Sequence, residues 1–307
     1  MKNILVTGGT GMVGVALQKL IPDAIFVGSN HFDLKNKEEV SKMFAYYEPE
    51  CVIHLAAKVG GVKANKDFLA DFYYDNIMIN TNVLECAKDY KVKKLLSLLS
   101  TCIYPDSVCY PLLEENIHEG EPHESNFAYA YAKRMLDVQS RAYREQHGCN
   151  FITAVPNNLF GENDNFDYNN SHVIPAIIRK IYEAQLNNTD VVLWGDGTPL
   201  REFTYSADLA KILLFLLEKY DGVHPINVGN TQERSIKEVT EIICDVLNFD
   251  GNVVWDDTKP AGQHRKPSDN SKLIDIGWRR EEYSNFYNSI ENVCNWFQKQ
   301  YPDIRGY

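Results

Sequence analysis

Short runs of apolar and β-branched residues alternate along the chain with longer stretches in which apolar positions recur every three or four residues. The short runs predict strands, and the longer stretches predict helices because that spacing places apolar side chains on one helix face. The predicted strands cover residues 3–8, 24–28, 51–57, 93–100 and 151–160. The predicted helices cover residues 12–20, 37–47, 80–90, 126–146, 173–184, 206–220, 235–247 and 281–300.

The order of these elements predicts the fold class. Strand and helix alternate over the first half of the chain, and the predicted strands are almost continuously apolar, which is typical of a parallel sheet covered by helices on both faces. We therefore expect an α/β protein with a Rossmann-type, doubly wound parallel sheet and a smaller α/β substrate-binding lobe. Residues 1–160 would form the Rossmann domain, with residues 201–229 returning to it, and residues 161–200 and 230–307 would form the lobe.

Composition and charge exclude several classes of function. The chain has 307 residues and a net charge of −11, which argues against a nucleic-acid-binding surface. Its seven cysteines include no C-x-x-C pair, which favours free thiols in a reducing compartment over disulfides or a metal site. No apolar run approaches the roughly 20 residues of a membrane span, and the start of the chain does not resemble a signal peptide. We expect a cytoplasmic protein without a metal.

A glycine-rich loop follows the first predicted strand and opens the first predicted helix. Gly8, Gly11 and Gly14 have the spacing G-x-x-G-x-x-G. The first glycine permits a tight turn, the second lets the backbone approach a pyrophosphate, and the third permits close packing of helix and strand. The helix start, at Met12 and Val13, presents free N–H groups to phosphate. The loop therefore predicts dinucleotide binding, against the alternative of a merely structural turn.

The end of the second predicted strand indicates which dinucleotide binds. An NAD enzyme usually has an acidic residue here for the ribose 2′-hydroxyl, whereas Ser29, Asn30 and His31 occupy these positions. Because no acid would repel a 2′-phosphate, we expect NADP(H), although no arginine is present there. His31 belongs either to this site or to a solvated loop, and Asp33 and Leu34 are predicted to contact the adenine.

Tyr129 and Lys133 form a candidate acid–base pair. Residues four apart share a helix face, so these two should be neighbours, whereas Tyr131 should face elsewhere and serve in packing. A free tyrosine has a pKa near 10, and a neighbouring ammonium should lower that pKa by favouring the phenolate. The pair is therefore predicted to exchange a proton with a substrate oxygen. The alternative is an unremarkable tyrosine and lysine on the surface.

Ser100 at the end of the fourth predicted strand, the Tyr129–Lys133 pair and the glycine loop together resemble the extended branch of the short-chain dehydrogenase/reductase superfamily. The segment REFTYSADLA (201–210) is similar to another marker of this branch. The resemblance implies that the Ser100 hydroxyl hydrogen-bonds the reacting carbonyl, that Tyr129 passes the proton, and that Lys133 also binds the nicotinamide ribose. It also implies cofactor contacts from Ala56 and Ala57.

Four further segments resemble the GDP-L-fucose synthase family within that branch. They are LAAKVGG (55–61), STCIYP (100–105), DNFDYNNSHVIPAIIRK (164–180) and KPAGQHRK (259–266). This resemblance implies epimerisation of GDP-4-keto-6-deoxy-D-mannose at C3 and C5, followed by reduction of the C4 ketone by NADPH. Cys102 would be the base, with a pKa lowered from about 8.5, and His172 the acid, since the pKa of histidine lies near neutrality. The alternatives are a small buried filler for Cys102 and a loop histidine for His172.

By the same resemblance, the lobe is predicted to bind a GDP-sugar, and the protein is predicted to be a homodimer. The candidate substrate residues are Asn158, Asn165, His172, Lys180, Trp194, Arg201, Lys259 and Arg265. Arg201 is favoured for the diphosphate because a guanidinium binds phosphate through two hydrogen bonds, and Trp194 either borders the guanine or belongs to the core. The chain departs from the family pattern at Asn157, Glu162, Asn163 and Ala261.

Three rival functions are less consistent with the sequence. A dehydratase of the same branch would have a pair of acids directly after the catalytic serine or threonine, where Thr101, Cys102 and Ile103 stand. A simple 4-epimerase would prefer an acid after the second strand. A non-catalytic, NADP-binding redox sensor would typically lack the Tyr–Lys pair, which this chain keeps. The residues therefore favour an epimerase that is also a reductase.

Overall fold

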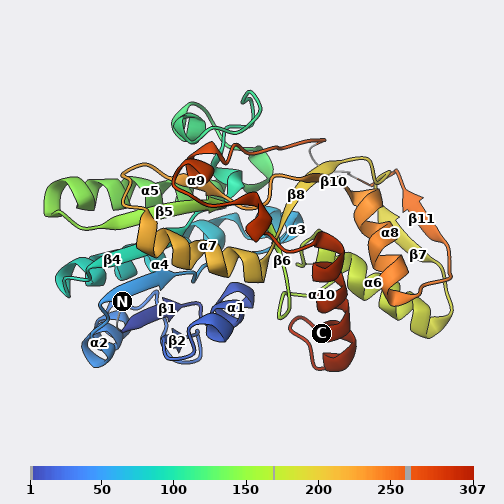
Figure 1. Ribbon diagram of the computed structural model, residues 1–307, viewed down its shortest axis with the longest axis horizontal. Coiled ribbons are helices and arrows are strands. Elements are labelled where there is room, and N and C mark those ends of the chain that lie inside the picture. Colours follow the sequence, from blue (N-terminus) through green and yellow to red (C-terminus); the bar gives the residue numbers. More distant parts are fainter. Residues whose placement is uncertain (1–2, 169, 260–263) are drawn as a thin grey trace.

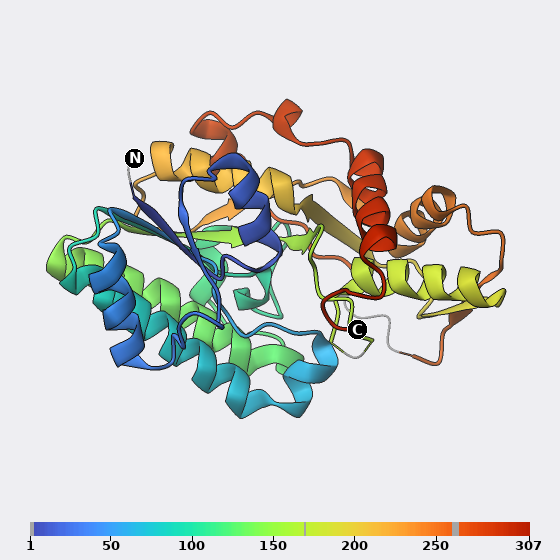
Figure 2. The ribbon, with the colours of Figure 1, turned by 90° about the horizontal axis from the view of Figure 1, so that it is seen from below.

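The computed structural model describes residues 3–168, 170–259 and 264–307. Over these residues the main sheet has six parallel strands in the order β2-β1-β3-β4-β5-β9, with helices on both faces (Figures 1 and 2). These strands are β1 (Ile4–Thr7), β2 (Ile25–Val27), β3 (Cys51–His54), β4 (Lys94–Leu98), β5 (Phe151–Pro156) and β9 (Ile226–Val228). The predicted Rossmann-type fold class is therefore confirmed.

The main sheet buries apolar side chains on both of its faces. Successive side chains of a strand point to opposite faces, and here Leu5 and Leu95 pack in one core cluster whereas Val6 and Leu96 pack in another. This double burial explains the continuous apolar runs of the sequence. The first face is covered by α2 (Lys37–Tyr47), α4 (Leu69–Asp89) and α5 (Phe127–His147), and the second by α1 (Met12–Leu20), α7 (Ser206–Lys219) and α9 (Ser271–Asp275).

The smaller lobe lies beside the main sheet, on the right of Figure 1. Its core contains Ile177, Ile243 and Phe297 from three different helices. In its sheets β7 pairs with β11, and β8 pairs with both β6 and β10. The remaining elements are β6 (Asn158–Phe160), β7 (Val191–Trp194), β8 (Leu200–Tyr205), β10 (Glu233–Ser235), β11 (Val253–Asp256), α3 (Val62–Asp67), α6 (Val173–Asn187), α8 (Ile236–Leu247) and α10 (Phe286–Gln300).

Several element boundaries differ from the sequence predictions. The run 151–160 forms two strands in different sheets, because β5 ends at Pro156, which has no N–H to continue a ladder. Helix α4 begins at Leu69 rather than at residue 80, so that Phe72 extends its buried face. Helix α10 begins at Phe286 rather than at residue 281, because Asn285 caps it by accepting the Asn288 N–H at 3.1 Å.

The chain passes between the main sheet and the lobe more than once. After β8, which pairs with β6 in the lobe, the chain returns to the main sheet as α7 and β9. Leu273 and Trp278 pack in the same core cluster as α7. The segment around α9 therefore packs on the main sheet, although it lies within the range 230–307 that was expected in the lobe.

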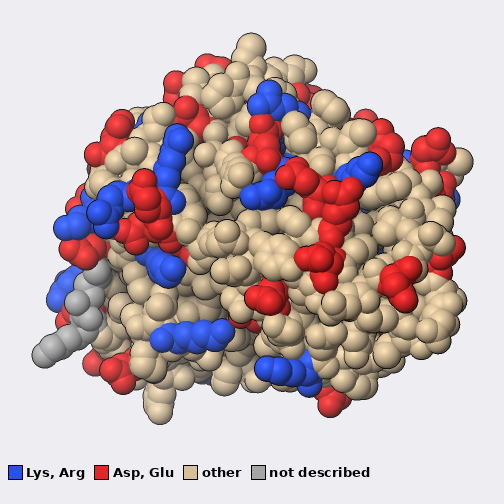
Figure 3. All heavy atoms as spheres, turned by 45° about the vertical axis from the view of Figure 1, so that its right-hand side comes forward, with Lys and Arg blue, Asp and Glu red and all other residues tan. Residues whose placement is uncertain are grey.

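The outer surface carries acidic and basic side chains side by side on the face drawn in Figure 3. Among the described residues, no helix combines the length and the apolar character that crossing a membrane requires. Because charges of both signs are interspersed on this face, it does not present one continuous cationic patch for an anionic ligand.

Candidate functional site

A cavity of about 1130 Å³ extends from the glycine-rich loop to the lobe. The predicted cofactor residues that line it are Gly8, Gly11, Met12, Val13, Gly14, Ser29, Asp33, Leu34, Ala56, Ala57, Tyr129 and Lys133. The other predicted residues that line it are Ser100, Asn158, His172 and Arg201. The predicted residues that are described but lie outside its lining are Asn30, Cys102, Asn165, Lys180, Trp194, Lys259 and Arg265.

The glycine loop has the geometry of a phosphate cradle. Gly8 has a φ of +70°, and a Cβ there would lie 2.7 Å from the backbone N of Ala56, which follows β3. A Cβ on Gly14 would collide with the Gly9 carbonyl. Gly11 is the N-cap of α1, whose first N–H groups have no acceptor within the helix. The loop lies between β1 and β3, where the strand order reverses, and it fits a dinucleotide diphosphate.

The end of β2 contributes Ser29 to the cavity, followed by Asp33 and Leu34. His31 turns back, and its Nδ1 accepts the Gly28 N–H at 3.0 Å. The imidazole therefore stabilises the turn after β2. Asp33 has a similar local contact, because its Oδ1 accepts the Lys35 N–H at 3.0 Å.

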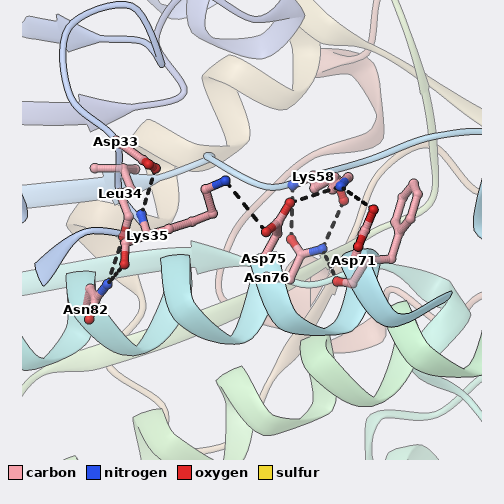
Figure 4. Close-up of polar contacts among 9 residues, drawn as sticks. Asp33, Leu34, Lys35, Lys58, Asp71, Asp75, Asn76 and Asn82 are labelled. Carbon is pink, nitrogen blue, oxygen red and sulfur yellow. Dashed lines mark hydrogen bonds and ion pairs between the residues drawn. The ribbon is translucent and has the colours of Figure 1, made fainter. Parts of the chain in front are cut away.

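Two lysines that sequence reasoning missed, Lys35 and Lys58, line the same end of the cavity. Figure 4 shows both pointing to Asp75 of α4, with Nζ–O distances of 3.7 and 2.9 Å. The Lys58 backbone is held by the Asn76 amide, which accepts its N–H at 3.1 Å and donates to its carbonyl at 3.0 Å. Lys58 lies within the LAAKVGG segment, so the sequence could have indicated it as a cavity residue. No sequence motif indicates Lys35, because only the fold brings α4 beside the end of β2.

Tyr129 and Lys133 share one side of α5, and the Lys133 Nζ lies 5.9 Å from the centre of the Tyr129 ring. Lys133 is buried and donates to the Leu98 carbonyl at 2.7 Å, and burial lowers its pKa to about 8. Burial also raises the pKa of Tyr129 above its ordinary value, and Cys102 adds to this rise. The expected lowering of the Tyr129 pKa was wrong, because desolvation dominates and the ammonium faces the ring and a carbonyl. Tyr129 is therefore a neutral phenol at pH 7.

Ser100 and Cys102 are held on one tight turn after β4. Ser100 caps a short 3-10 helix, Thr101–Ile103, and its hydroxyl accepts the Cys102 N–H at 3.5 Å. Cys102 is half-buried and packs against the main-sheet core. Burial raises the pKa of its thiol, whereas Ser100, Lys266 and Lys133 lower it. The expected net lowering of this pKa was wrong, since burial outweighs the neighbouring hydrogen bond and cations.

His172 lines the cavity from the lobe side, whereas Ser100 and Tyr129 line it from the main-sheet side. It is the N-cap residue of α6, and its carbonyl accepts the Ala176 N–H at 3.1 Å. His172 is exposed to the cavity, and desolvation there lowers the pKa of its imidazole, so the neutral form prevails at pH 7. A bound substrate would have to favour the protonated form for His172 to act as the predicted acid. The fold thus brings an imidazole, a hydroxyl and a phenol to one cavity.

The predicted substrate residues divide into two groups. Arg201 and Asn158 line the cavity from the neighbouring strands β8 and β6, and the Asn158 amide donates to the Glu202 carbonyl at 2.9 Å. The Nζ of Lys180 lies 5.7 Å from the Trp194 ring on the surface of the lobe. Trp194 is 60% exposed, which excludes the alternative of a core tryptophan.

The basic loop after β11 places neither of its two predicted substrate ligands, Lys259 and Arg265, in the lining of the cavity. The Arg265 guanidinium is engaged by the Glu233 carboxylate, with its Nε at 2.8 and 2.9 Å from the two oxygens. The Lys259 N–H is bonded to the Asp256 carbonyl at 3.2 Å. Ala261, one of the departures from the family pattern, lies outside the described residues.

The other three departures have defined contacts. Asn157 accepts from the Thr204 hydroxyl at 2.6 Å and donates to the Asn230 carbonyl at 2.8 Å, which ties β8 to the end of β9. Glu162 accepts from the Tyr205 hydroxyl at 2.8 Å. Asn163 donates to the Thr10 carbonyl at 2.9 Å. These residues therefore support the walls of the cavity.

Comparison with known proteins adds independent findings. Residues 4–229 match the model of the NAD dependent epimerase/dehydratase family. The chain is 41% identical to a GDP-L-fucose synthase of Dictyostelium discoideum over 99% of this chain and 98% of that protein. It is also 41% identical to GDP-L-fucose synthase 1 of Arabidopsis thaliana, over 95% and 94% of the two chains. A crystal structure of a GDP-L-fucose synthetase from Naegleria fowleri bound to NADP has a TM-score of 0.94 and 42% identity, covering 99% of this chain and 95% of that chain.

Proposed function

Because the chain belongs to the GDP-L-fucose synthases of the NAD dependent epimerase/dehydratase family, we propose that it converts GDP-4-keto-6-deoxy-D-mannose to GDP-L-fucose. The reaction comprises epimerisation at C3 and C5, followed by reduction of the C4 ketone. The observation that carries this proposal is the single cavity that joins the glycine loop to Ser100, Tyr129 and His172.

NADP(H) is the cofactor in this proposal. The glycine loop and the first turn of α1 would hold its diphosphate, and Ser29 would face its 2′-phosphate without an acid to repel it. NADPH supplies the hydride for C4. Asp33 and Leu34 would contact the adenine, and Lys133 would bind the nicotinamide ribose from its anchored position beside Leu98.

Tyr129 donates the proton in the reduction. Its raised pKa keeps the phenol protonated at pH 7, so the hydroxyl is available as a hydrogen-bond donor and then as an acid toward the C4 oxygen. Ser100 lines the cavity beside it and supplies a second hydroxyl for the same oxygen. The two hydroxyls also stabilise the enolate that forms when a proton leaves C3 or C5.

Cys102 and His172 invert C3 and C5 in this proposal. The C4 ketone acidifies the neighbouring hydrogens, and each inversion requires a base on one side and an acid on the other. Cys102 lies outside the lining of the cavity but follows Ser100 on the turn after β4, so its thiol would have to turn toward the sugar to act as the base. His172 lines the cavity from the lobe. The Lys133 and Lys266 cations favour the thiolate that acts as the base.

The lobe binds the GDP moiety. Arg201 and Asn158 would face the diphosphate and the sugar from within the cavity. Trp194 offers an exposed aromatic face for the guanine, with Lys180 beside it. Asn165, Lys259 and Arg265 remain candidates, and Arg265 would have to exchange the Glu233 carboxylate for a phosphate.

Incubating the purified protein with GDP-4-keto-6-deoxy-D-mannose and NADPH should convert them to GDP-L-fucose and NADP in equal amounts. The measurement is the fall in NADPH absorbance together with separation of the nucleotide sugars, and a sample without the sugar is the control. No NADPH oxidation would favour a non-catalytic dinucleotide sensor. Oxidation that yields an unepimerised sugar would leave a simple reductase.

A homodimer is part of the same proposal. An apolar surface groove runs between the start of α4 and the start of α5, lined by Leu69, Ala70, Tyr73, Phe127, Ala128, Tyr131 and Met135. Tyr73, Phe127 and Met135 are exposed. Contiguous apolar surface of this kind is typical of an interface between subunits, and a twofold axis would let two copies bury the same face.

Met135→Glu should convert the dimer to monomers, because the interface would have to bury an unpaired charge. We expect the dissociation constant to rise by roughly 100-fold or more, measured by sedimentation velocity over a range of protein concentrations. Tyr46→Glu, at a 78%-exposed position on α2, is the matched control. A wild-type protein that sediments as a monomer would contradict the proposed dimer.

The cysteines support a cytoplasmic location. None of the seven, all of which lie in the described part of the chain, is in a disulfide, and Cys109 is exposed. Free thiols persist in a reducing compartment, whereas exposed ones tend to be oxidised outside it. We therefore place the protein in the cytoplasm in this proposal.

A further inference from the structure

Asp164 is a buried acid that the proposed reaction does not use. Its side chain is 6% exposed and lines the cavity, with Oδ1 accepting the Asn165 N–H at 2.7 Å. Its Oδ2 is buried and has no hydrogen-bond partner among the described residues. Burial raises its pKa to about 7, and Arg305 opposes this rise. A buried carboxyl oxygen without a partner is uncommon and calls for an explanation.

Arg305 reaches the cavity from the C-terminal segment of the chain. Figures 1 and 2 show this end of the chain beside the loop that leads into α6. The Arg305 carbonyl accepts the Phe166 N–H at 2.9 Å, and the Gly306 carbonyl accepts from Arg179 at 2.9 Å. Ile304 is buried in the lobe core. Hydrogen bonds and burial thus hold the backbone on both sides of Arg305.

The path of this segment depends on a glycine. Gly306 has a φ of +89°, and a Cβ there would collide with the Asn165 side chain. Arg179 of α6 is buried and stabilises this segment. Its guanidinium donates to the Phe166 carbonyl and lies 4.0 Å from the Tyr168 ring centre. These contacts therefore fix the C-terminal segment in position along one side of the cavity.

The neighbours of Asp164 show which end of the cavity this segment closes. Asn163 donates to the carbonyl of Thr10 in the glycine loop at 2.9 Å. A Cβ on Gly161 would lie 3.4 Å from the Met12 side chain at the start of α1. The loop that carries Asp164 thus contacts the phosphate cradle, and Arg305 lines the same cavity.

We propose that Arg305 binds the diphosphate of the dinucleotide, so that the C-terminal segment closes the cofactor end of the cavity. The inference rests on the proposed binding of NADP(H). Arg305 lines the same cavity as Asp164, and no ion pair or side-chain hydrogen bond that would compete for a ligand is found for its guanidinium within the described part of the chain. It can therefore hydrogen-bond a phosphate opposite the N–H groups of α1.

The test is the affinity of Arg305→Gln for NADPH, for NADH and for GDP, measured by isothermal titration calorimetry at one ionic strength. Loss of a charge-assisted hydrogen bond should weaken NADPH and NADH alike, by about tenfold, and leave GDP unchanged. NADPH and NADH share the diphosphate and differ in the 2′-phosphate. Arg305→Lys, which keeps the charge, should recover part of the lost affinity.

Arg280→Gln is the matched control, because this exposed arginine lies outside the lining of the cavity. Thermal unfolding of each variant separates loss of a ligand contact from loss of the folded segment. Unchanged dinucleotide affinity, weakening of NADPH alone, or weakening of GDP alone would each overturn the assignment. A wild-type protein that binds neither dinucleotide would instead overturn the proposed function itself.

Discussion

Tyr129→Phe should slow NADPH oxidation by at least about 100-fold, because general acid catalysis typically contributes factors of 10² to 10⁴. The substitution removes only the hydroxyl and keeps the ring that packs at the edge of Phe72 and under the Lys133 Nζ. Dinucleotide affinity should therefore stay within about twofold, which corresponds to less than 0.5 kcal/mol. Single-turnover oxidation of NADPH with the keto sugar measures the reduction step directly.

Tyr131→Phe is the matched control for this prediction. Tyr131 lies two residues away on the same helix, but its ring lies 5.4 Å from the Arg134 guanidinium and lines the apolar surface groove. Removing this hydroxyl should leave the rate of reduction within about twofold. If Tyr131→Phe were the more damaging of the two variants, the assignment of the proton donor by helix face would fail.

Cys102→Ser should block epimerisation while leaving the dinucleotide site intact. A serine hydroxyl is a far weaker base than a thiolate, so proton exchange at C3 and C5 should fall by roughly 100-fold or more. The measurement is incorporation of deuterium from heavy water into the keto sugar with the oxidised cofactor present. In the wild-type protein this exchange should accelerate as the pH rises toward the raised pKa of the Cys102 thiol, because the thiolate fraction increases.

Cys109→Ser provides the control for this substitution, since Cys109 is an exposed thiol in the loop that follows. It should exchange deuterium at the wild-type rate. NADPH affinity of Cys102→Ser, measured by titration, should match that of the wild type. Normal production of GDP-L-fucose by Cys102→Ser would remove this thiol from the mechanism and assign the proton removal to another group.

The sequence determined the features that depend on local periodicity. Apolar runs such as the one that contains Leu95 and Leu96 determined a sheet buried on both faces, since successive side chains point in opposite directions. The spacing of Gly8, Gly11 and Gly14 likewise predicted a tight turn and close packing at the helix start, and Gly8 has a φ of +70° while Gly14 has no room for a Cβ. The four-residue spacing predicted that Tyr129 and Lys133 would share a side of α5, as they do. Each of these features depends only on residues that are close together in the sequence.

Tertiary structure alone decided which of these groups are desolvated and which are already paired. The sequence predicted that Lys133 would lower the pKa of Tyr129, whereas burial raises it. The spacing of two residues along a helix does not show how deeply the helix buries them. The Glu233 carboxylate is hydrogen-bonded to the Arg265 guanidinium, and the C-terminal segment brings Arg305 to the cavity. Solvent exposure and ion pairing arise from segments far apart in the sequence, whose positions follow from packing of the whole core rather than from local spacing.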